Sequence, residues 1–194
     1  MRPVRFQLEL LKPELLLDEA KIASTLVFYG SARIPAPGVA SAHPDPDVAK
    51  RLEALSPYYE EARKLAQIAS RVPRDEDGWR HLVVCSGGGP SIMEAANRGA
   101  DDVKADSIAL NIVLPHEQVP NPYVTPDLSF QFHYFALRKM HFLLRARAVA
   151  VFPGGFGTMD EGYEALTLMQ TGKSQLMPLV LVDHWFRCTR TIHQ

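Results

Sequence analysis

The sequence predicts an α/β protein in which a doubly wound, Rossmann-like parallel sheet forms a single domain. Three observations support this fold class. Apolar segments of strand length alternate with segments whose apolar residues recur at helical spacing. Most strand segments are apolar throughout, as expected when helices cover both faces of a parallel sheet. Three of the strands run directly into turns that contain glycine, where such sheets bind ligands.

Residues 1–24 are expected to form an N-terminal helical arm, with a helix over 6–23 that breaks near Pro13 because proline removes a backbone donor. Residues 25–194 then form the nucleotide-binding domain. Its strands are expected where apolar and β-branched residues run together: 25–30, 81–85, 107–114, 129–135, 148–152 and 177–182. Its helices are expected at 57–70, at 91–98 with Gly99 ending it, at 136–147, and from Thr158 to the glycine at 172.

Three further segments are less regular. The stretch 34–46 holds four of the fifteen prolines and predicts a surface loop within an insertion that spans 34–55. The stretch 115–126 is a second long loop rich in proline, and loops of this length often carry function. Residues 183–194 form an atypical tail.

The composition excludes several classes of function. The 21 basic and 22 acidic residues nearly cancel, so no charge excess indicates nucleic acid or a membrane surface as a partner. Two cysteines cannot build a disulfide framework, and Cys85 is expected to be a buried thiol. No apolar run approaches ~18–20 residues, so no segment is expected to cross a bilayer, and a cytoplasmic location is the default expectation. The seven histidines show no spacing typical of metal ligands, and no metal site is predicted.

The segment 147–170 is the strongest indication of a ligand site. Pro153 ends the strand 148–152, and three glycines follow, at Gly154, Gly155 and Gly157. We expect them to form a tight turn with positive φ that leaves backbone N–H groups facing outward. Thr158 is a good N-cap for the next helix. Open N–H groups and the positive end of a helix dipole together predict that this turn binds an anion such as phosphate.

A second glycine run, Gly87, Gly88 and Gly89, follows the strand 81–85, and Ser31 follows the first strand. Because the carboxyl ends of parallel strands meet at one edge, these turns should lie together with the 154–158 turn. The dinucleotide spacing G-x-G-x-x-G is absent, and Gly172-Lys173-Ser174 lies after a helix rather than before one. A mononucleotide or a sugar phosphate is therefore the predicted ligand.

Four charged residues flank these turns: Glu94, Arg138, Lys139 and Glu161. Each glutamate lies three residues after a serine or threonine, Ser91 or Thr158, which is the spacing of a capping box. Spacing alone therefore favours capping over catalysis for both glutamates. Arg138 and Lys139 stand near the start of a helix, where basic charge opposes the dipole. That position is a weak indication of an anionic partner, and a solvated pair explains it equally well.

The run Pro153-Gly154-Gly155-Phe156-Gly157-Thr158-x-x-Glu161 resembles the motif of the LOG family, the cytokinin riboside 5′-monophosphate phosphoribohydrolases formerly grouped as lysine decarboxylases. Arg138-Lys139, the 87–89 glycines and Met93-Glu94 extend the resemblance, which covers residues 26–182. Leu114–Gln118, Asn121 and 164–173 are more similar to the longer bacterial branch, whose members are often labelled AMP nucleosidases. Ser91 stands where a glycine is common in the family.

The resemblance implies hydrolysis of the N-glycosidic bond of a nucleoside 5′-monophosphate, either AMP or a cytokinin riboside monophosphate, without a cofactor. It implies that Arg138 and Glu161 are catalytic and that a homodimer carries the site near its subunit boundary. The substrate-binding residues that it implies are Ser31, Gly87, Gly88, Gly89, Met93, Glu94, Glu117, Lys139, Gly154, Gly155, Gly157 and Thr158. For the base, Glu117 and Asn121 are the nearest candidates, and a structural role in their loop is an equal alternative.

Two other activities stay open on this scaffold. A non-catalytic carrier of a nucleotide or of the molybdenum cofactor would need the glycine turns but not Glu161. A lysine decarboxylase would normally need a lysine that forms a Schiff base with pyridoxal phosphate, and no lysine in the sequence has a recognisable setting for that chemistry.

Overall fold

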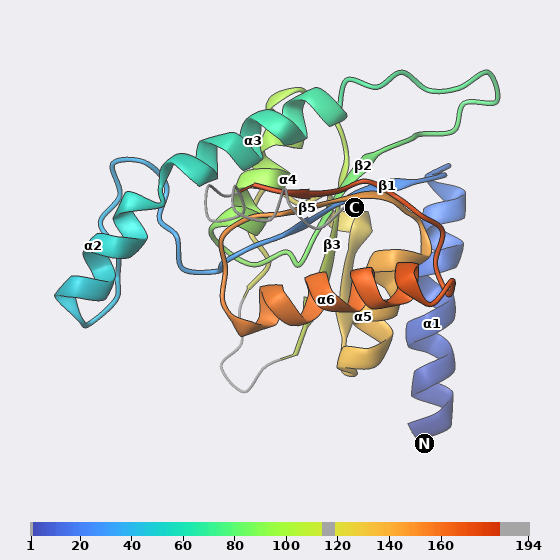
Figure 1. Cartoon of the computed structure of the whole chain (residues 1–194). Helices are drawn as coiled ribbons and strands as arrows, with labels where there is room; N and C mark the ends of the chain where they lie inside the picture. Colours follow the sequence, from blue (N-terminus) through green and yellow to red (C-terminus); the bar gives the residue numbers. More distant parts are fainter. Residues whose placement is uncertain (1, 114–118, 183–194) are drawn as a thin grey trace, which may run out of the picture.

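The structure, a computed structural model, describes residues 2–113 and 119–182 (Figure 1). Six strands form one parallel sheet in the order β4-β3-β2-β1-β5-β6. They are β1 (Thr25–Tyr29), β2 (Val83–Ser86), β3 (Ser107–Ile112), β4 (Ser129–Phe132), β5 (Ala146–Val151) and β6 (Leu179–Leu181). The predicted doubly wound α/β fold is confirmed, because the chain builds the sheet outward from β1 to β4 and then returns to β5 on the other side of β1.

Helices cover both faces of the sheet. They are α1 (Arg2–Glu19), α2 (Pro46–Ala54), α3 (Pro57–Ala69), α4 (Ile92–Asp102), α5 (Phe135–Leu144) and α6 (Phe156–Gln170), with a short 3₁₀ helix, η1 (Pro126–Leu128). The helices α3 and α4 lie on one face, and α1, α5 and α6 lie on the other (Figure 1). The alternation of side chains in β1 serves both layers: Phe28 packs in the core under α3 and α4, and Tyr29 packs in the core under α5 and α6.

The expected break of the first helix at Pro13 is wrong, because α1 continues through it. Proline removes the N–H that would bond to the carbonyl of Glu9 one turn earlier. The ring nitrogen Nε2 of His141 on α5 lies 3.0 Å from that carbonyl oxygen. Since a carbonyl can only accept, Nε2 donates and replaces the missing backbone donor. A tertiary contact therefore satisfies the carbonyl that Pro13 leaves without its backbone donor.

Two other boundaries differ from the prediction for reasons of packing. The helix α4 runs past Gly99 to Asp102, because Gly99 lies where α3 comes close: a side chain there would lie 2.7 Å from Ala66 Cβ. Glycine here permits helix contact rather than ending a helix. The stretch 34–55, expected as a loop insertion, contains α2, which begins at Asp45 with that side chain accepting from the amides of Asp47 and Val48.

The topological switch point lies between β1 and β5, because the two halves of the sheet diverge there. Tyr29 pairs with Val151, so β1 and β5 end at the same level. The strand β2 pairs with β1 on its other side. The three segments that follow β1, β2 and β5 therefore meet at one edge of the sheet, as the sequence predicts.

Candidate active site

Hydrogen bonds tie the segments after β1 and β5, and the start of α4, to one another. The amide of Ser31 donates to the carbonyl of Pro153 at 3.0 Å, and the carbonyl of Ser31 accepts from the amide of Ile92 at 3.3 Å. The Ser31 hydroxyl accepts from the amide of Arg33 at 3.0 Å. Ser31 is buried, and these bonds make it a brace between the turns.

The helix α6 begins at Phe156, two residues before the predicted start, with Gly155 as its N-cap residue. No side chain caps this end. Within the described residues, the amides of Phe156, Gly157 and Thr158 have no hydrogen-bond acceptor. Thr158 is therefore not the N-cap, and the predicted capping box with Glu161 is wrong. Three open donors at the positive end of a helix form a suitable anion site.

The glycines of this turn are required for different reasons from those predicted. None of Gly154, Gly155 and Gly157 has a positive φ. Gly154 excludes a side chain because one would contact Thr158, whose Cβ would lie at 2.6 Å. Gly155 and Gly157 have room for a side chain: a Cβ at Gly157 would meet no atom within 4 Å, and one at Gly155 would meet only Arg33 Nη2, at 3.7 Å. Neither backbone conformation nor internal packing explains these two glycines, which leave room for a ligand above the helix.

Arg138 and Glu161 form a buried ion pair one helical turn beyond that N-terminus. Arg138 Nη1 donates to Glu161 Oε1 at 3.0 Å, and the two side chains are 10% and 17% exposed. Arg138 Nε donates to the carbonyl of Leu110 on β3 at 2.6 Å. The guanidinium carbon lies 4.9 Å from the centre of the Phe142 ring. Arg138 is thus fixed by three partners and is not the solvated residue that the sequence allowed.

Burial and charge perturb the titration of groups at this pair. Burial raises the pKa of Glu161, and the positive charge of Arg138 opposes that rise. The pKa of the neighbouring Tyr29 is raised well above its usual value, first by burial and then by the charge of Glu161. A carboxylate with a perturbed pKa and a specific charged partner at the switch point of an α/β sheet is a candidate catalytic group.

The second glycine turn lies against this pair. A side chain at Gly87 would come within 2.6 Å of Arg138 Nη2 and 2.7 Å of Met93 Sδ, so Gly87 gives the guanidinium its space. Gly88 has a φ of +73°, a conformation that favours glycine. The structure therefore brings Gly87 and Met93 to Arg138, where the role of Gly87 is to admit the guanidinium, whereas Gly88 lies against Ala109 and Asn111 of β3.

Asn121 holds the second glycine turn in place. Its amide nitrogen donates to the carbonyls of Gly88 and Gly89, both at 3.1 Å, and to Asn97 Oδ1 at 2.9 Å. Because Asn121 is buried and its amide is used within the protein, the structural interpretation holds for it. Glu117, the other candidate for contacting the base, lies outside the described residues.

The second predicted capping box is also wrong. Ser91 occupies the N-cap position of α4 but its side chain makes no capping bond. Glu94 instead accepts a hydrogen bond from the Tyr59 hydroxyl on α3 at 2.7 Å. This contact directs Glu94 to the layer formed by α3, on the other face of the sheet from the Arg138–Glu161 pair.

Ser91 is strained, and we expect Ser91→Gly to stabilise the protein. Its φ of 67° and ψ of −126° suit glycine, and its buried hydroxyl has no hydrogen-bond partner among the described residues. Ser91→Gly removes both the strained backbone conformation and the unsatisfied hydroxyl, although glycine makes the unfolded chain more flexible. The net effect should raise the free energy of unfolding by about 1–2 kcal/mol. Thermal denaturation followed by circular dichroism measures this, with Ser174→Gly, at a half-buried position beyond the C-terminal end of α6, as control. An unchanged or lower melting temperature for Ser91→Gly would show that Ser91 is not strained.

Lys139 lies beside the pair but is bound by acidic neighbours on α6. Its ammonium group lies 2.7 Å from Glu164 Oε2 and 3.0 Å from Asp160 Oδ2. These carboxylates, Glu164 first, raise the pKa of Lys139. A lysine that forms Schiff bases needs a lowered pKa, so this setting does not favour decarboxylase chemistry at Lys139.

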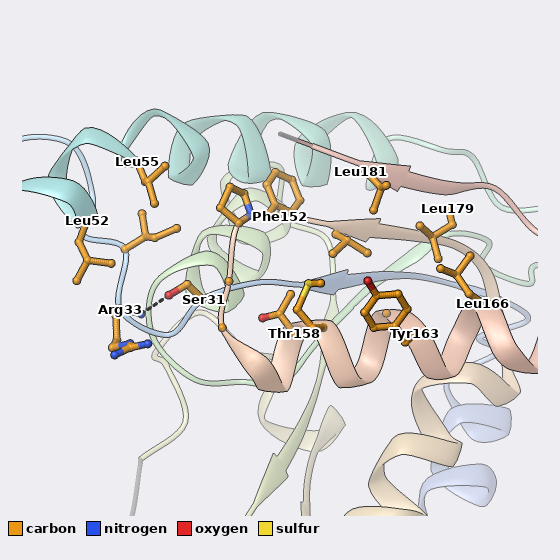
Figure 2. Close-up of a pocket in the computed structure, with 17 residues that line it drawn as sticks. Ser31, Arg33, Leu52, Leu55, Phe152, Thr158, Tyr163, Leu166, Leu179 and Leu181 are labelled. Atoms are coloured by element: carbon orange, nitrogen blue, oxygen red, sulfur yellow. Dashed lines mark hydrogen bonds between the residues drawn. The ribbon is translucent and has the colours of Figure 1, made fainter. Parts of the chain in front are cut away.

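A groove of about 480 Å³ opens on the other side of the glycine turn (Figure 2). Its lining includes Ser31, Arg33, Gly154, Gly155 and Thr158 together with apolar side chains of α2, α6 and β6. Glu161 is not among its lining residues, since it projects from a different face of α6. Arg33 is the residue at this edge that was not predicted, although a basic side chain two residues after Ser31 could have indicated it.

In residues 2–113 and 119–182, no group of three or more histidine, cysteine or acidic side chains is placed to hold a metal ion. Within the same ranges, no helix has the length and apolar character needed to cross a bilayer. The Cys85 thiol is buried and unpaired, and burial raises its pKa, as expected for an inert thiol.

Comparison with known proteins finds a matching family and relatives that are named as nucleosidases. The family model described as "possible lysine decarboxylase" matches residues 93–193. The pyrimidine/purine nucleotide 5′-monophosphate nucleosidase of Escherichia coli strain K12 is 32% identical over 119 residues, which cover 54% of this chain and 25% of that protein. Its counterpart in Escherichia coli O157:H7 matches with the same identity and coverage. The match thus spans about a quarter of the length of these curated relatives.

One solved structure is similar to this chain in fold. The X-ray structure of TM1055, a structural genomics target, has a TM-score of 0.51 at 20% identity and covers 88% of this chain and 82% of that one. At this identity the likeness shows the α/β fold alone. The molybdenum cofactor (Moco) carrier protein from Chlamydomonas reinhardtii has a TM-score of 0.46 at 17% identity, covering 81% of this chain and 75% of that one, which is too low to support an inference.

Proposed function

The chain belongs to the family described as possible lysine decarboxylase, which is the LOG family indicated by its glycine motif, and we propose that it hydrolyses nucleoside 5′-monophosphates. The products would be the free base and ribose 5-phosphate. The observation that carries this proposal is the buried Arg138–Glu161 pair one turn beyond the open N-terminus of α6. The nucleosidase names of the relatives support the same reaction class.

The phosphate of the substrate would bind the amides of Phe156, Gly157 and Thr158. These amides have no acceptor among the described residues, and the positive end of the α6 dipole attracts the phosphate charge. The open space at Gly155 and Gly157 lets a phosphate approach the backbone closely. Glu161 lies about one helical turn further along α6, so the ribose of a ligand anchored here would come within reach of its carboxylate.

Glu161 would stabilise the positive charge that develops on the ribose when the glycosidic bond breaks. Carboxylates play this part in glycoside hydrolysis, where the transition state resembles an oxocarbenium ion. Arg138 binds Glu161 through Oε1 only, and within the described residues no group donates to Oε2. The free oxygen can face the sugar or orient the attacking water, while Arg138 keeps the carboxylate ionised and in place.

Arg138 would also donate a hydrogen bond to the leaving base or to the phosphate through Nη2, the nitrogen atom that faces Gly87. Its Nε and Nη1 are held by Leu110 and Glu161, so the planar fork presents Nη2 in a fixed direction. Lys139, held by Asp160 and Glu164, adds positive charge near the site without reaching the pair. The homodimer and the cytoplasmic location stay predictions of the sequence, and the sequence leaves open whether the base is that of AMP or of a cytokinin riboside monophosphate.

Incubation of the chain with AMP tests the proposed function. We expect adenine and ribose 5-phosphate in equal amounts, and adenosine turned over far more slowly because binding energy from the phosphate is used in the transition state. Chromatography detects the base, and a reducing-sugar assay detects ribose 5-phosphate. AMP that binds without turnover would contradict the enzyme proposal and support a carrier. Equal rates for AMP and adenosine would contradict the phosphate site.

Gly155→Val should weaken AMP binding without unfolding the protein. The φ of −92° and ψ of −160° at Gly155 are accessible to valine, and the added Cβ would meet only Arg33 Nη2, at 3.7 Å. The valine side chain would occupy the space proposed for phosphate, so we expect the Kd for AMP to rise roughly 10- to 100-fold, or about 1.4–2.8 kcal/mol. Calorimetric titration measures the Kd, with Thr171→Val at the other end of α6 as control. Unchanged affinity would place the phosphate elsewhere.

A further inference from the structure

We propose that Arg33 binds the phosphate of the substrate and sets the preference for nucleotides over nucleosides. This inference rests on the proposed function, because it assigns a second partner to the phosphate at the N-terminus of α6. Arg33 belongs neither to the glycine motif nor to the Arg138–Glu161 pair. It comes from the segment after β1, on the side of the glycine turn that faces the groove (Figure 2).

The guanidinium of Arg33 lies close to Gly155. An ideal Cβ built on Gly155 has one protein atom within 4 Å, and that atom is Arg33 Nη2 at 3.7 Å. The guanidinium therefore stands across the empty space that Gly155 leaves at the start of α6. The backbone of Arg33 is held there, because its amide donates to the Ser31 hydroxyl at 3.0 Å and Ser31 is bonded to Pro153.

The charge of Arg33 is available, unlike that of the other cations at this edge. Arg138 pairs with Glu161, and Lys139 pairs with Asp160 and Glu164. Among the described residues, no carboxylate lies within salt-bridge distance of Arg33 and no acceptor receives a hydrogen bond from its side chain. An exposed arginine beside three open backbone amides suits an anion with several oxygens.

The two sets of donors would divide the phosphate oxygens between them. Backbone amides and a helix dipole supply partial charge from one direction, whereas a guanidinium fork supplies full charge and can bind two oxygens at once. The phosphate of a nucleoside monophosphate carries the negative charge that Arg33 would recognise, and a nucleoside lacks it. Arg33 would thus contribute equally to binding in the ground state and in the transition state. Its removal should therefore raise KM and leave kcat nearly unchanged.

The test compares Arg33→Gln and Arg33→Lys with Arg71→Gln, which removes the same charge from an exposed arginine following α3. For Arg33→Gln we expect the KM for AMP to rise roughly 10- to 100-fold, the range for one lost charged hydrogen-bonding partner, with kcat within about threefold of the parent. Arg33→Lys should lose part of this effect, and KM for adenosine should not change. Calorimetric titration with AMP and with inorganic phosphate gives the same comparison without turnover, and circular dichroism checks the fold.

The outcomes separate this inference from the proposed function. If the parent hydrolyses AMP and Arg33→Gln matches Arg71→Gln in KM and Kd, Arg33 does not bind phosphate and the proposed function stands. If the parent binds AMP without hydrolysis, the enzyme proposal fails, and the Kd values still decide the role of Arg33. If the parent binds neither AMP nor phosphate, both proposals are overturned.

Discussion

Glu161→Gln should reduce the kcat for adenine release from AMP by about 10²–10⁴-fold. Glutamine keeps the shape of the side chain and can still accept the hydrogen bond from Arg138 Nη1, so the substitution removes charge and little else. The transition state would lose a carboxylate facing the positive charge on the ribose, an effect of several kcal/mol in a buried site. The kcat is measured by the rate of adenine release at saturating AMP.

Stability and binding should change little in this variant. Burial raises the pKa of Glu161, so ionising this carboxyl costs more in the folded protein than in the unfolded chain, and the neutral glutamine avoids that desolvation cost. The matched control is Asp160→Asn, which neutralises the preceding residue, 62% exposed and paired with Lys139. A kcat for Glu161→Gln within about threefold of the parent, under ~0.7 kcal/mol, would remove Glu161 from the mechanism.

Arg138→Lys should reduce kcat by about 10²–10³-fold although it keeps the charge. Arginine donates to Leu110 O at 2.6 Å and to Glu161 at 3.0 Å while its flat face lies over Phe142. The single ammonium group of lysine cannot occupy both donor positions or stack in the same way. The carboxylate of Glu161 would then move away from its present position, and small errors in the position of a catalytic group are costly.

The fold of Arg138→Lys should be weaker but intact. Leaving Leu110 O without its donor should lower the free energy of unfolding by about 1–3 kcal/mol. For a chain of this size, each kcal/mol lowers the melting temperature by roughly 2–4 °C. The control is Arg147→Lys, since Arg147 is exposed and makes one side-chain bond, to Gln175 at 2.9 Å. If Arg138→Lys kept the parent kcat while melting earlier, Arg138 would have a structural role alone.

The sequence predicted the features that follow from periodicity and topology. Apolar runs located the strands, and the rule that ligands lie at the carboxyl ends of parallel strands brought Ser31, Gly87 and Gly154 to one edge. The pairing of Arg138 with Glu161 could not be read from spacing, because the residues lie 23 positions apart on two helices. The family resemblance named both residues, and the structure brings them into contact.

The failures of prediction have a shared cause in tertiary contacts. Capping boxes at Thr158 and Ser91 were expected from local spacing, but Arg138 and Tyr59 bind the two glutamates instead. Pro13 was expected to break α1, yet His141 supplies the missing donor. Gly99 was expected to end α4, yet it admits α3. In each case a partner distant in sequence outweighs a local preference that is worth about 1 kcal/mol or a few.

The measurement that tests the central claim most directly is the kcat of the double variant Glu161→Gln/Arg138→Lys beside the two single variants. If the buried pair acts as one catalytic unit, either substitution disables it. The double variant should then be no more than about threefold slower than the slower single variant. Losses that multiply, so that the double variant shows the product of the two single effects, would mean that Arg138 and Glu161 act independently and would contradict the account.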